Sequence, residues 1–250
     1  MRSSEIVTTL KAPPEAVWKA ITDPEEITRW LAPQASVEPQ VGGKYSISWG
    51  PGTEGTMLIE IWEPNRRLRL IDDRRVAVEY FIETEGGVTT LRLVHSGFGD
   101  GAEWDGEYEG AKKGWLVFFL ILKHNLEQHP GEAIRQISIS LPVDASPDEQ
   151  WDRLLGRQLG HLESGSHYSL QMPGGDRLEG SVTFTDNRAY FVGVVENWNR
   201  ALMTVFCERF QGKGFLTVNV ALYGTMVAQA DEIETRWTTA LKELFCFQSL

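Results

Sequence analysis

Two stretches of the chain, EIVTTLKAPPEAVWKAI (residues 5–21) and QISISLPVDASPDEQWDRLL (residues 136–155), share one pattern. Each begins with alternating apolar and polar residues, which is typical of a strand with one buried face. Each then passes through a turn to a proline followed by an acidic residue. Proline suits the first turn of a helix, and an acidic side chain there complements the helix dipole. The chain therefore contains the same strand-to-helix unit twice.

The motifs that follow each unit also recur. Two short motifs come in the same order in both halves: GKYSI at 43–47 with SHYSL at 166–170, and EGTM at 54–57 with EGSV at 179–182. Each half then ends with a hairpin turn, a strand, a glycine and a helix centred on a tryptophan, Trp115 or Trp237. We therefore predict two related domains, residues 1–130 and 134–250, because an ordered internal repeat indicates repeated structure.

Each half is predicted to contain an antiparallel sheet. In the first half the alternating segments are at 43–49, 54–62, 66–73, 76–84 and 88–96. Short turns join them, and short turns force antiparallel neighbours. The second half has 14 residues from Trp151 to Gly165, where the first has 25 from Trp18 to Gly43. It is therefore expected to lack a second short helix and any counterpart of Trp30.

The segment Gly97-Phe98-Gly99-Asp100-Gly101-Ala102 has the glycine spacing of a dinucleotide-binding loop. Such a loop belongs to the first strand-to-helix turn of a parallel βαβ unit, whereas this one follows an antiparallel meander. Asp100, Glu103 and Asp105 would also place negative charge beside a pyrophosphate. We interpret the glycines as a turn into a long helix and predict no cofactor.

The order of elements in the first half resembles the START-like (helix-grip, SRPBCC) superfamily, in its heat-shock-protein-90 ATPase activator-like branch. The resemblance covers about residues 5–128, and its motifs are Pro14–Trp18, Asp23–Trp30, Val41–Tyr45, Glu54–Thr56, Glu63–Leu68, Gly97-Phe98 and Gly114-Trp115. The second half resembles a diverged copy. The resemblance implies an α+β protein of two helix-grip domains. Each would be an antiparallel curved sheet wrapped on a long C-terminal helix, often with a cavity between them.

Composition narrows the classes of partner. The chain has 35 Asp and Glu against 24 Lys and Arg, without a basic cluster, so neither nucleic acid nor an anionic bilayer is expected to bind. The longest apolar run, Trp115–Leu122, is far shorter than the roughly 20 residues of a membrane span. No apolar export signal is evident near the start, and Cys207 and Cys246 have no CxxC spacing. A cytoplasmic protein with reduced thiols is therefore expected.

The sequence offers little catalytic chemistry. None of the five histidines has metal-ligand spacing, so no metal site and no catalytic residue is predicted. His95 shares strand parity with Leu91 and Leu93 and is expected to point inward, either into a cavity or as a hydrogen-bonded structural histidine. The enzymatic alternative would combine His95 with Glu60 or Glu79, although a solvent-facing position explains the glutamates better.

The aromatic residues suggest a binding function. Six of the nine tryptophans lie in the first half. A plain core is one interpretation, but Trp and Tyr also suit the wall of an apolar cavity that orients its ligand. The predicted cavity-lining residues are Trp30, Tyr45, Trp49, Tyr80, His95, Trp115 and Phe119.

Three functions are consistent with these features. The preferred one is non-enzymatic binding of a small hydrophobic or amphipathic ligand by the first domain, with a structural second domain. The alternatives are a co-chaperone or other protein-interaction module, which would bind a chaperone, and a cyclase-like or hydrolytic enzyme. The second domain is expected to hold the smaller cavity, because large side chains would fill it: Tyr168, Phe184, Phe191 and Phe206.

The long helix after the glycines is predicted to face the first sheet with a stripe that runs from Trp104 to Leu126. Apolar residues also lie off that stripe. We expect Val117, Leu120 and Ile121 to pack against the second domain or against a second subunit, which would make a homodimer.

Overall fold

The computed structural model describes residues 1–250 except for residues 51, 187, 211 and 247–250, and the side chains of residues 210 and 246 are not described. The predicted thiol of Cys246 therefore lies outside the described residues. The chain divides into two compact units, Met1–Pro130 and Gly131–Leu250. Each unit has its own hydrophobic core.

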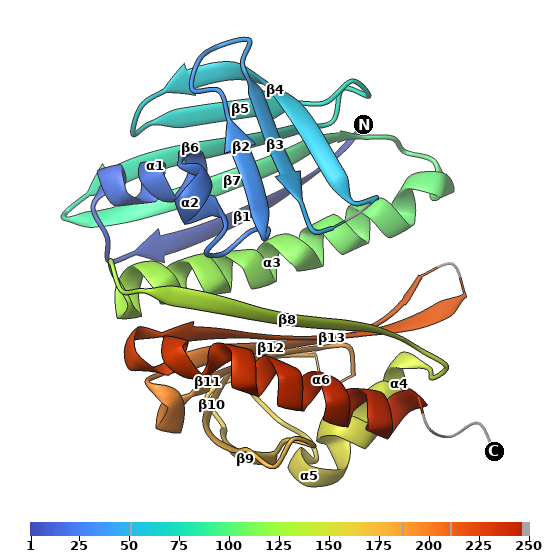
Figure 1. The fold of residues 1–250 in the computed structure, drawn as a ribbon. Helices are drawn as coiled ribbons and strands as arrows, with labels where there is room; N and C mark the ends of the chain where they lie inside the picture. Colours follow the sequence, from blue (N-terminus) through green and yellow to red (C-terminus); the bar gives the residue numbers. More distant parts are fainter. Residues whose placement is uncertain (51, 187, 211, 247–250) are drawn as a thin grey trace. The chain divides into compact units, whose positions relative to one another are not determined.

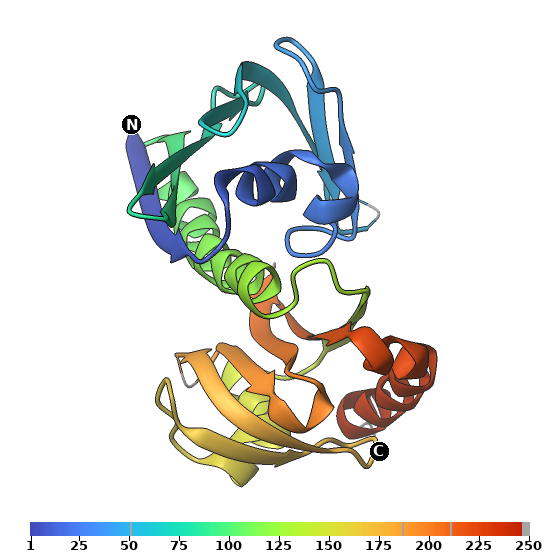
Figure 2. The same cartoon turned by 90° about the vertical axis from the view of Figure 1, so that its left-hand side faces the viewer.

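The first unit is a seven-stranded antiparallel sheet with helices on its inner face (Figure 1). Its elements are β1 (Arg2–Leu10), α1 (Pro14–Thr22), α2 (Pro24–Ile27), β2 (Gln34–Val37), β3 (Lys44–Ser48), β4 (Glu54–Glu63), β5 (Arg67–Ile71), β6 (Ala77–Glu85), β7 (Val88–Phe98), η1 (Ala102–Trp104) and α3 (Asp105–Gln128). The strand order is β1-β7-β6-β5-β4-β3-β2. In Figure 2 the sheet forms an arch over α1 and α2. The predicted segments correspond to β3–β7, whereas the four-residue β2 was missed because it has no long alternating pattern.

The second unit repeats this order with six strands. Its elements are β8 (Ile134–Val143), α4 (Pro147–Trp151), η2 (Asp152–Gly156), α5 (Arg157–Leu159), β9 (His167–Gln171), β10 (Arg177–Thr185), β11 (Tyr190–Val195), η3 (Glu196–Trp198), β12 (Ala201–Phe210), β13 (Lys213–Tyr223), η4 (Gly224–Gln229) and α6 (Ala230–Cys246). The strand order β8-β13-β12-β11-β10-β9 matches that of the first sheet without β2. The helical segment α4-η2-α5 runs without interruption to Leu159. Because the connection between the first two strands is shorter in the second unit, that unit has neither a counterpart of β2 nor a separate second helix.

The proline-acid motifs begin helices as predicted. Pro14 occupies the first turn of α1, and Glu15 follows it. In the second unit Ser146 and Glu149 form a capping box at the start of α4, which satisfies two otherwise unpaired groups of the first turn. These local signals fix the point at which each first strand gives way to a helix.

The core of the second unit is filled by large side chains, among them Trp151, Tyr168, Phe191 and Trp237. The predictions for Tyr168 and Phe191 are confirmed, but those for Phe184 and Phe206 are wrong. A β-bulge between Val182 and Phe184 reverses the side-chain parity of β10, and Phe206 pairs with Tyr190 on the other face of the sheet. Both side chains are only half-buried.

The terminal helices differ as the sequence predicts, with one exception. On α6 the residues Ala230, Ile233, Trp237 and Leu241 are buried, while the opposite side of the helix is exposed. On α3 the buried face is broader than one stripe, because Phe118 and Ile121 also pack against the core of the first unit. The expectation that Ile121 points away from this core is therefore wrong.

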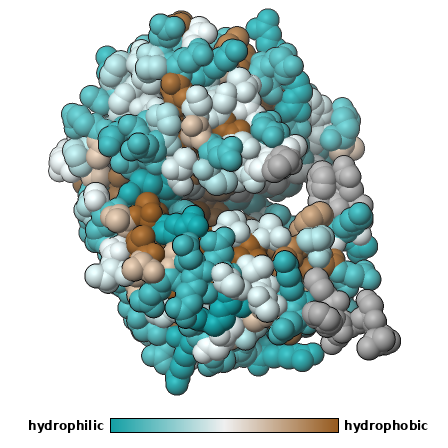
Figure 3. Space-filling model, viewed as in Figure 1, coloured by the Kyte–Doolittle hydropathy of each residue, from teal (hydrophilic) through white to brown (hydrophobic). Residues whose placement is uncertain are grey.

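The face shown in Figure 3 is mostly hydrophilic, with hydrophobic residues in small groups. Among the described residues, no helix is both long enough and apolar enough to cross a membrane.

Candidate functional site

The candidate site lies on the inner face of the first sheet, against α3. Strands β6 and β7 pair so that Tyr80 lies opposite Leu93 and Val78 lies opposite His95. Paired residues of an antiparallel ladder project to the same side of the sheet. Tyr80, Val78 and Leu93 belong to the buried core, so His95 projects to the inner face, as its parity predicts.

Trp115 of α3 is the centre of an aromatic cluster on this face. Its ring centroid is 6.1 Å from those of Tyr80 and His95 and 6.4 Å from that of Phe119, with edge-to-face geometry at each contact. Phe119 in turn contacts Trp30 at 6.4 Å. Five of the seven predicted residues are therefore joined by direct ring contacts.

The other two predicted residues lie around this cluster. Tyr45 is buried in the same core, and its hydroxyl donates to the Ile21 carbonyl at 3.3 Å. Trp49 is 47 % exposed and stacks on Phe118, which itself contacts Trp115. Trp49 is thus at the solvent edge of the cluster rather than within it.

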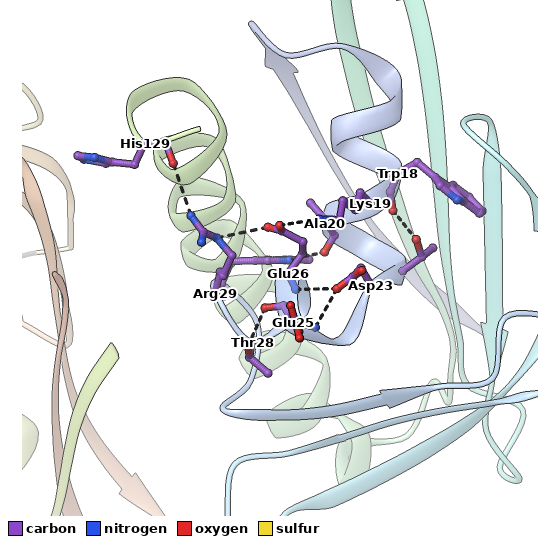
Figure 4. Close-up of polar contacts among 11 residues, drawn as sticks. Trp18, Lys19, Ala20, Asp23, Glu25, Glu26, Thr28, Arg29 and His129 are labelled. Atoms are coloured by element: carbon purple, nitrogen blue, oxygen red, sulfur yellow. Dashed lines mark hydrogen bonds and ion pairs between the residues drawn. The ribbon is translucent and has the colours of Figure 1, made fainter. Parts of the chain in front are cut away.

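Helices α1 and α2 fix Trp30, whose indole N–H donates to the Ala20 carbonyl at 2.9 Å. Figure 4 shows the polar contacts that hold this helix pair. The Asp23 carboxylate caps α2 by accepting from the backbone N–H groups of the next turn, and Glu26 bridges Lys19 and Arg29 at 3.2 and 3.3 Å. Arg29 also donates to the His129 carbonyl at the end of α3 (3.5 Å), so the helix pair is tied to that helix.

His95 is held as a neutral ring. Its Nδ1 accepts a hydrogen bond from the Trp115 indole N–H at 3.0 Å, and the ring packs edge-to-face on Phe98. Burial lowers the pKa of His95 to about 4. At neutral pH the ring therefore carries one proton, and because Nδ1 is an acceptor that proton is on Nε2.

Tyr80 is 1 % exposed, and its hydroxyl makes no hydrogen bond to any described residue. Burial raises the pKa of Tyr80 well above its usual value, so the hydroxyl remains protonated. A buried hydroxyl without a protein partner in an aromatic wall suits a bound water or ligand.

The predicted enzymatic pairing of His95 with Glu60 or Glu79 is not formed. Glu79 lies opposite Val94 in the ladder and therefore projects to the outer face, away from His95. It is 7 % exposed and accepts hydrogen bonds from Arg67 (2.7 Å) and Arg69 (2.9 Å).

Glu60 shares this network, because Arg69 also donates to it at 2.8 Å. The expectation that both glutamates simply face solvent is wrong for Glu79. Two arginines of the neighbouring strand cover it and compensate its charge.

Sequence reasoning missed Ser4, which pairs with His95 across β1 and β7 and is buried on the same face. Its parity with Ile6 and Leu10 on the strand could have identified it. Phe98 and Phe118 were also missed as members of the cluster.

A groove of about 770 Å³ lies in the second unit, between the outer side of α6 and the β9–β10 turn. Thr235, Arg236 and Glu243 are among its lining residues. Because it lies outside the core, it does not bear on the predicted difference between the two cavities. The described residues contain no group of three or more His, Cys, Asp or Glu side chains arranged to hold a metal ion.

An antiparallel sheet curved over short helices and followed by a long terminal helix defines the helix-grip class of protein, and the chain contains this arrangement twice, with one continuous helical segment in place of the helix pair in the second unit. Residues 11–127 match the family described as "Activator of Hsp90 ATPase homolog 1-like protein". This match covers most of the first unit, the part of the chain whose sequence motifs resemble this family.

Three solved structures illustrate the likeness, each with a TM-score below 0.5. The Aha1 dimer from Colwellia psychrerythraea is 21% identical over 52% of this chain and 99% of its own, with a TM-score of 0.47. The di-domain ARO/CYC BexL from the BE-7585A biosynthetic pathway is 14% identical over 95% of this chain and 96% of its own (TM-score 0.45). DynU16, a putative protein of the dynemicin biosynthetic locus, is 17% identical over 97% and 96% (TM-score 0.44). No curated protein matches the chain in sequence.

Proposed function

We propose that the first unit binds a small hydrophobic or amphipathic molecule on the inner face of its sheet, against Trp115. The observation that carries this proposal is the Tyr80 hydroxyl, which belongs to a buried ring packed against Trp115 and has no hydrogen-bond partner among the described residues. A polar group of this kind in a core without a ligand would cost about 1–3 kcal/mol. Binding sites for small molecules have this composition, with many apolar groups and a few polar ones.

We propose a structural role for the second unit. Its inner-face tyrosine, Tyr168, is the counterpart of Tyr45; the Tyr168 hydroxyl donates to the Val194 carbonyl at 3.1 Å and the ring packs on Phe191. The indole N–H of Trp237 donates to Asp176 at 2.6 Å. These polar groups are satisfied within the protein, unlike that of Tyr80.

Binding can be tested with delipidated protein and N-phenyl-1-naphthylamine, a neutral apolar dye. We expect dye fluorescence to rise on mixing and the melting temperature to increase with dye concentration, because a ligand that binds only the folded state stabilises it. An absence of both effects would count against the proposal.

A pair of variants locates the site. Val78→Phe adds bulk on the inner face beside His95, whereas Val94→Phe adds the same side chain on the outer face. We expect the first to abolish dye binding and the second to preserve it, with circular dichroism confirming that both are folded. Equal binding by the two variants would place the dye elsewhere.

A second candidate function, interaction with a chaperone, is favoured by the family match of residues 11–127. It predicts that the purified protein changes the ATPase rate of purified Hsp90. If the rate is unchanged at saturating protein, this candidate is removed without affecting the ligand-binding proposal.

A further inference from the structure

Three polar side chains lie together on the inner face of the first sheet. Ser4 on β1 pairs directly with His95 on β7, and Tyr80 lies on the adjacent strand β6. The Ser4 and Tyr80 hydroxyls and the His95 Nε2 make no hydrogen bond to any described residue. All three therefore keep their hydrogen-bonding capacity for a bound molecule.

These groups present donors rather than charges. His95 Nε2 carries the proton of a neutral ring, because Nδ1 accepts from Trp115, and it can therefore only donate. The Tyr80 hydroxyl is protonated and can also donate. A ligand that satisfies both must bring an acceptor atom.

On β6 and β7, the described residues that share the inner face with Tyr80 and His95 provide no counter-ion for a charged ligand. The buried carboxylate of the described first unit, Glu79, projects to the outer face and is paired with arginines. The charged groups that influence the pKa of His95 are Glu107, Asp72 and Arg74, and Arg74 donates to both carboxylates. An ionised ligand would lose its hydration without compensation, which is strongly unfavourable.

The two residues that carry the donors are neighbours on the sheet and share one aromatic partner. Tyr80 and His95 are diagonal neighbours on adjacent strands, and the Cα atoms of such pairs are usually about 7–8 Å apart. Both rings lie edge-to-face against Trp115. The surface between them is aromatic and suits a flat ligand of about two fused rings, which would pack on the indole.

We infer that the first unit selects a neutral aromatic molecule that carries an acceptor oxygen, such as a ketone carbonyl, which binds the donors of His95 and Tyr80. This inference rests on the proposed function and adds to it the chemical class of the ligand. It distinguishes the site from a purely apolar cavity, which would not discriminate between a ketone and a hydrocarbon of the same shape.

The inference can be tested with three naphthalenes on the full chain: 2-acetylnaphthalene, 2-ethylnaphthalene and 2-naphthoate. The first carries a neutral acceptor, the second has a similar shape without one, and the third is an anion. By titration of tryptophan fluorescence, we expect 2-acetylnaphthalene to bind about tenfold more tightly than 2-ethylnaphthalene, and 2-naphthoate to bind most weakly.

Two variants test whether the donors of Tyr80 and His95 cause this preference for the ketone. Tyr80→Phe and His95→Leu should each reduce the ketone preference by about fivefold while leaving the affinity for 2-ethylnaphthalene nearly unchanged. Tyr190→Phe, which removes a hydroxyl bonded to Glu208 in the second unit, is the matched control and should change neither affinity. The Tyr80→Phe variant loses one oxygen atom and keeps the ring packing, so it tests the inference even if His95→Leu does not fold.

The outcomes separate the two proposals. Equal binding of ketone and hydrocarbon overturns the inference and leaves the proposed function standing. If 2-naphthoate binds most tightly of the three, the inference that the ligand is neutral is wrong. Failure of all three to bind, together with failure of the apolar dye, overturns the proposed function and this inference with it.

Discussion

Trp115 donates its indole N–H to Nδ1 of His95 at 3.0 Å, and this bond joins the terminal helix of the first unit to the last strand of its sheet. Because His95 is largely buried, its pKa falls from its usual value of 6.5 to about 4. The ring must remain neutral to accept this bond, so protonation breaks it. The bond therefore makes the first unit sensitive to acid.

The first prediction concerns this sensitivity. The unfolded chain takes up a proton on His95 below pH 6.5, whereas the folded protein does so only near pH 4. The contribution of His95 to stability is thus complete above pH 6.5 and falls as the pH drops towards 4, by at most about 3 kcal/mol. Urea unfolding at pH 7 and pH 4 should show a smaller loss for His95→Gln, which does not titrate, than for the wild type. An equal loss in both proteins would show that other groups cause it.

The second prediction concerns Glu79. This carboxylate is buried on the outer face of the first sheet and accepts from Arg67 and Arg69. Glu79→Ala leaves the two guanidinium groups without that acceptor and should lower the free energy of unfolding by about 2 kcal/mol. Glu60→Ala removes the more exposed partner of Arg69 and should cost under about 1 kcal/mol. Urea unfolding of both variants measures the difference, and a larger effect at Glu60 would contradict this assignment.

The repeat and the strand alternation predicted most of the fold, because each half buries one face of a sheet against one terminal helix. The predictions that failed depend on interactions that the periodicity of the sequence does not encode. The bulge in β10 reversed the expected side of Phe184, and arginines of a neighbouring strand buried Glu79. The four-residue strand β2 is too short to show a period.

The candidate site was only partly predictable, for a related reason. Parity placed Tyr80 and His95 on the inner face, and helical spacing placed Trp115 and Phe119 opposite them. The bond from Trp115 to His95 and the unpaired state of the Tyr80 hydroxyl depend on side-chain orientation across three elements. Ser4 was missed because a lone serine in an alternating strand gives no signal of its own.

The third prediction concerns the side of α3 that carries Val117 and Leu120. The sequence predicts that this side is covered by the second domain or by a second copy of the chain. Leu120→Glu should therefore lower the melting temperature, or shift a dimer towards monomer, because it places a charge in an apolar contact. Light scattering coupled to gel filtration gives the mass, and Lys112→Glu at an exposed position of the same helix is the control. If Leu120→Glu changes neither mass nor melting temperature, the prediction is wrong.

The last prediction concerns the glycines that lead into α3. Gly97 has a φ of 95°, and a Cβ atom there would lie 2.3 Å from the Arg75 carbonyl oxygen and 2.9 Å from the Val76 Cα. Both neighbours are backbone atoms, so neither can rotate away. Gly97→Ala should therefore destabilise the first unit by roughly 3 kcal/mol or more through strain and overlap.

Gly110 provides the matched control for the same substitution. It lies within α3, is exposed, and has no atom within 4 Å of an added Cβ. Gly110→Ala should therefore stabilise the protein by about 0.5–1 kcal/mol, because alanine favours the helix. Thermal and urea unfolding of the two variants should thus give effects of opposite sign. If Gly97→Ala is as stable as the wild type, the close approach of the β5–β6 turn to Gly97 does not exist, and the turn into α3 is not built on this glycine.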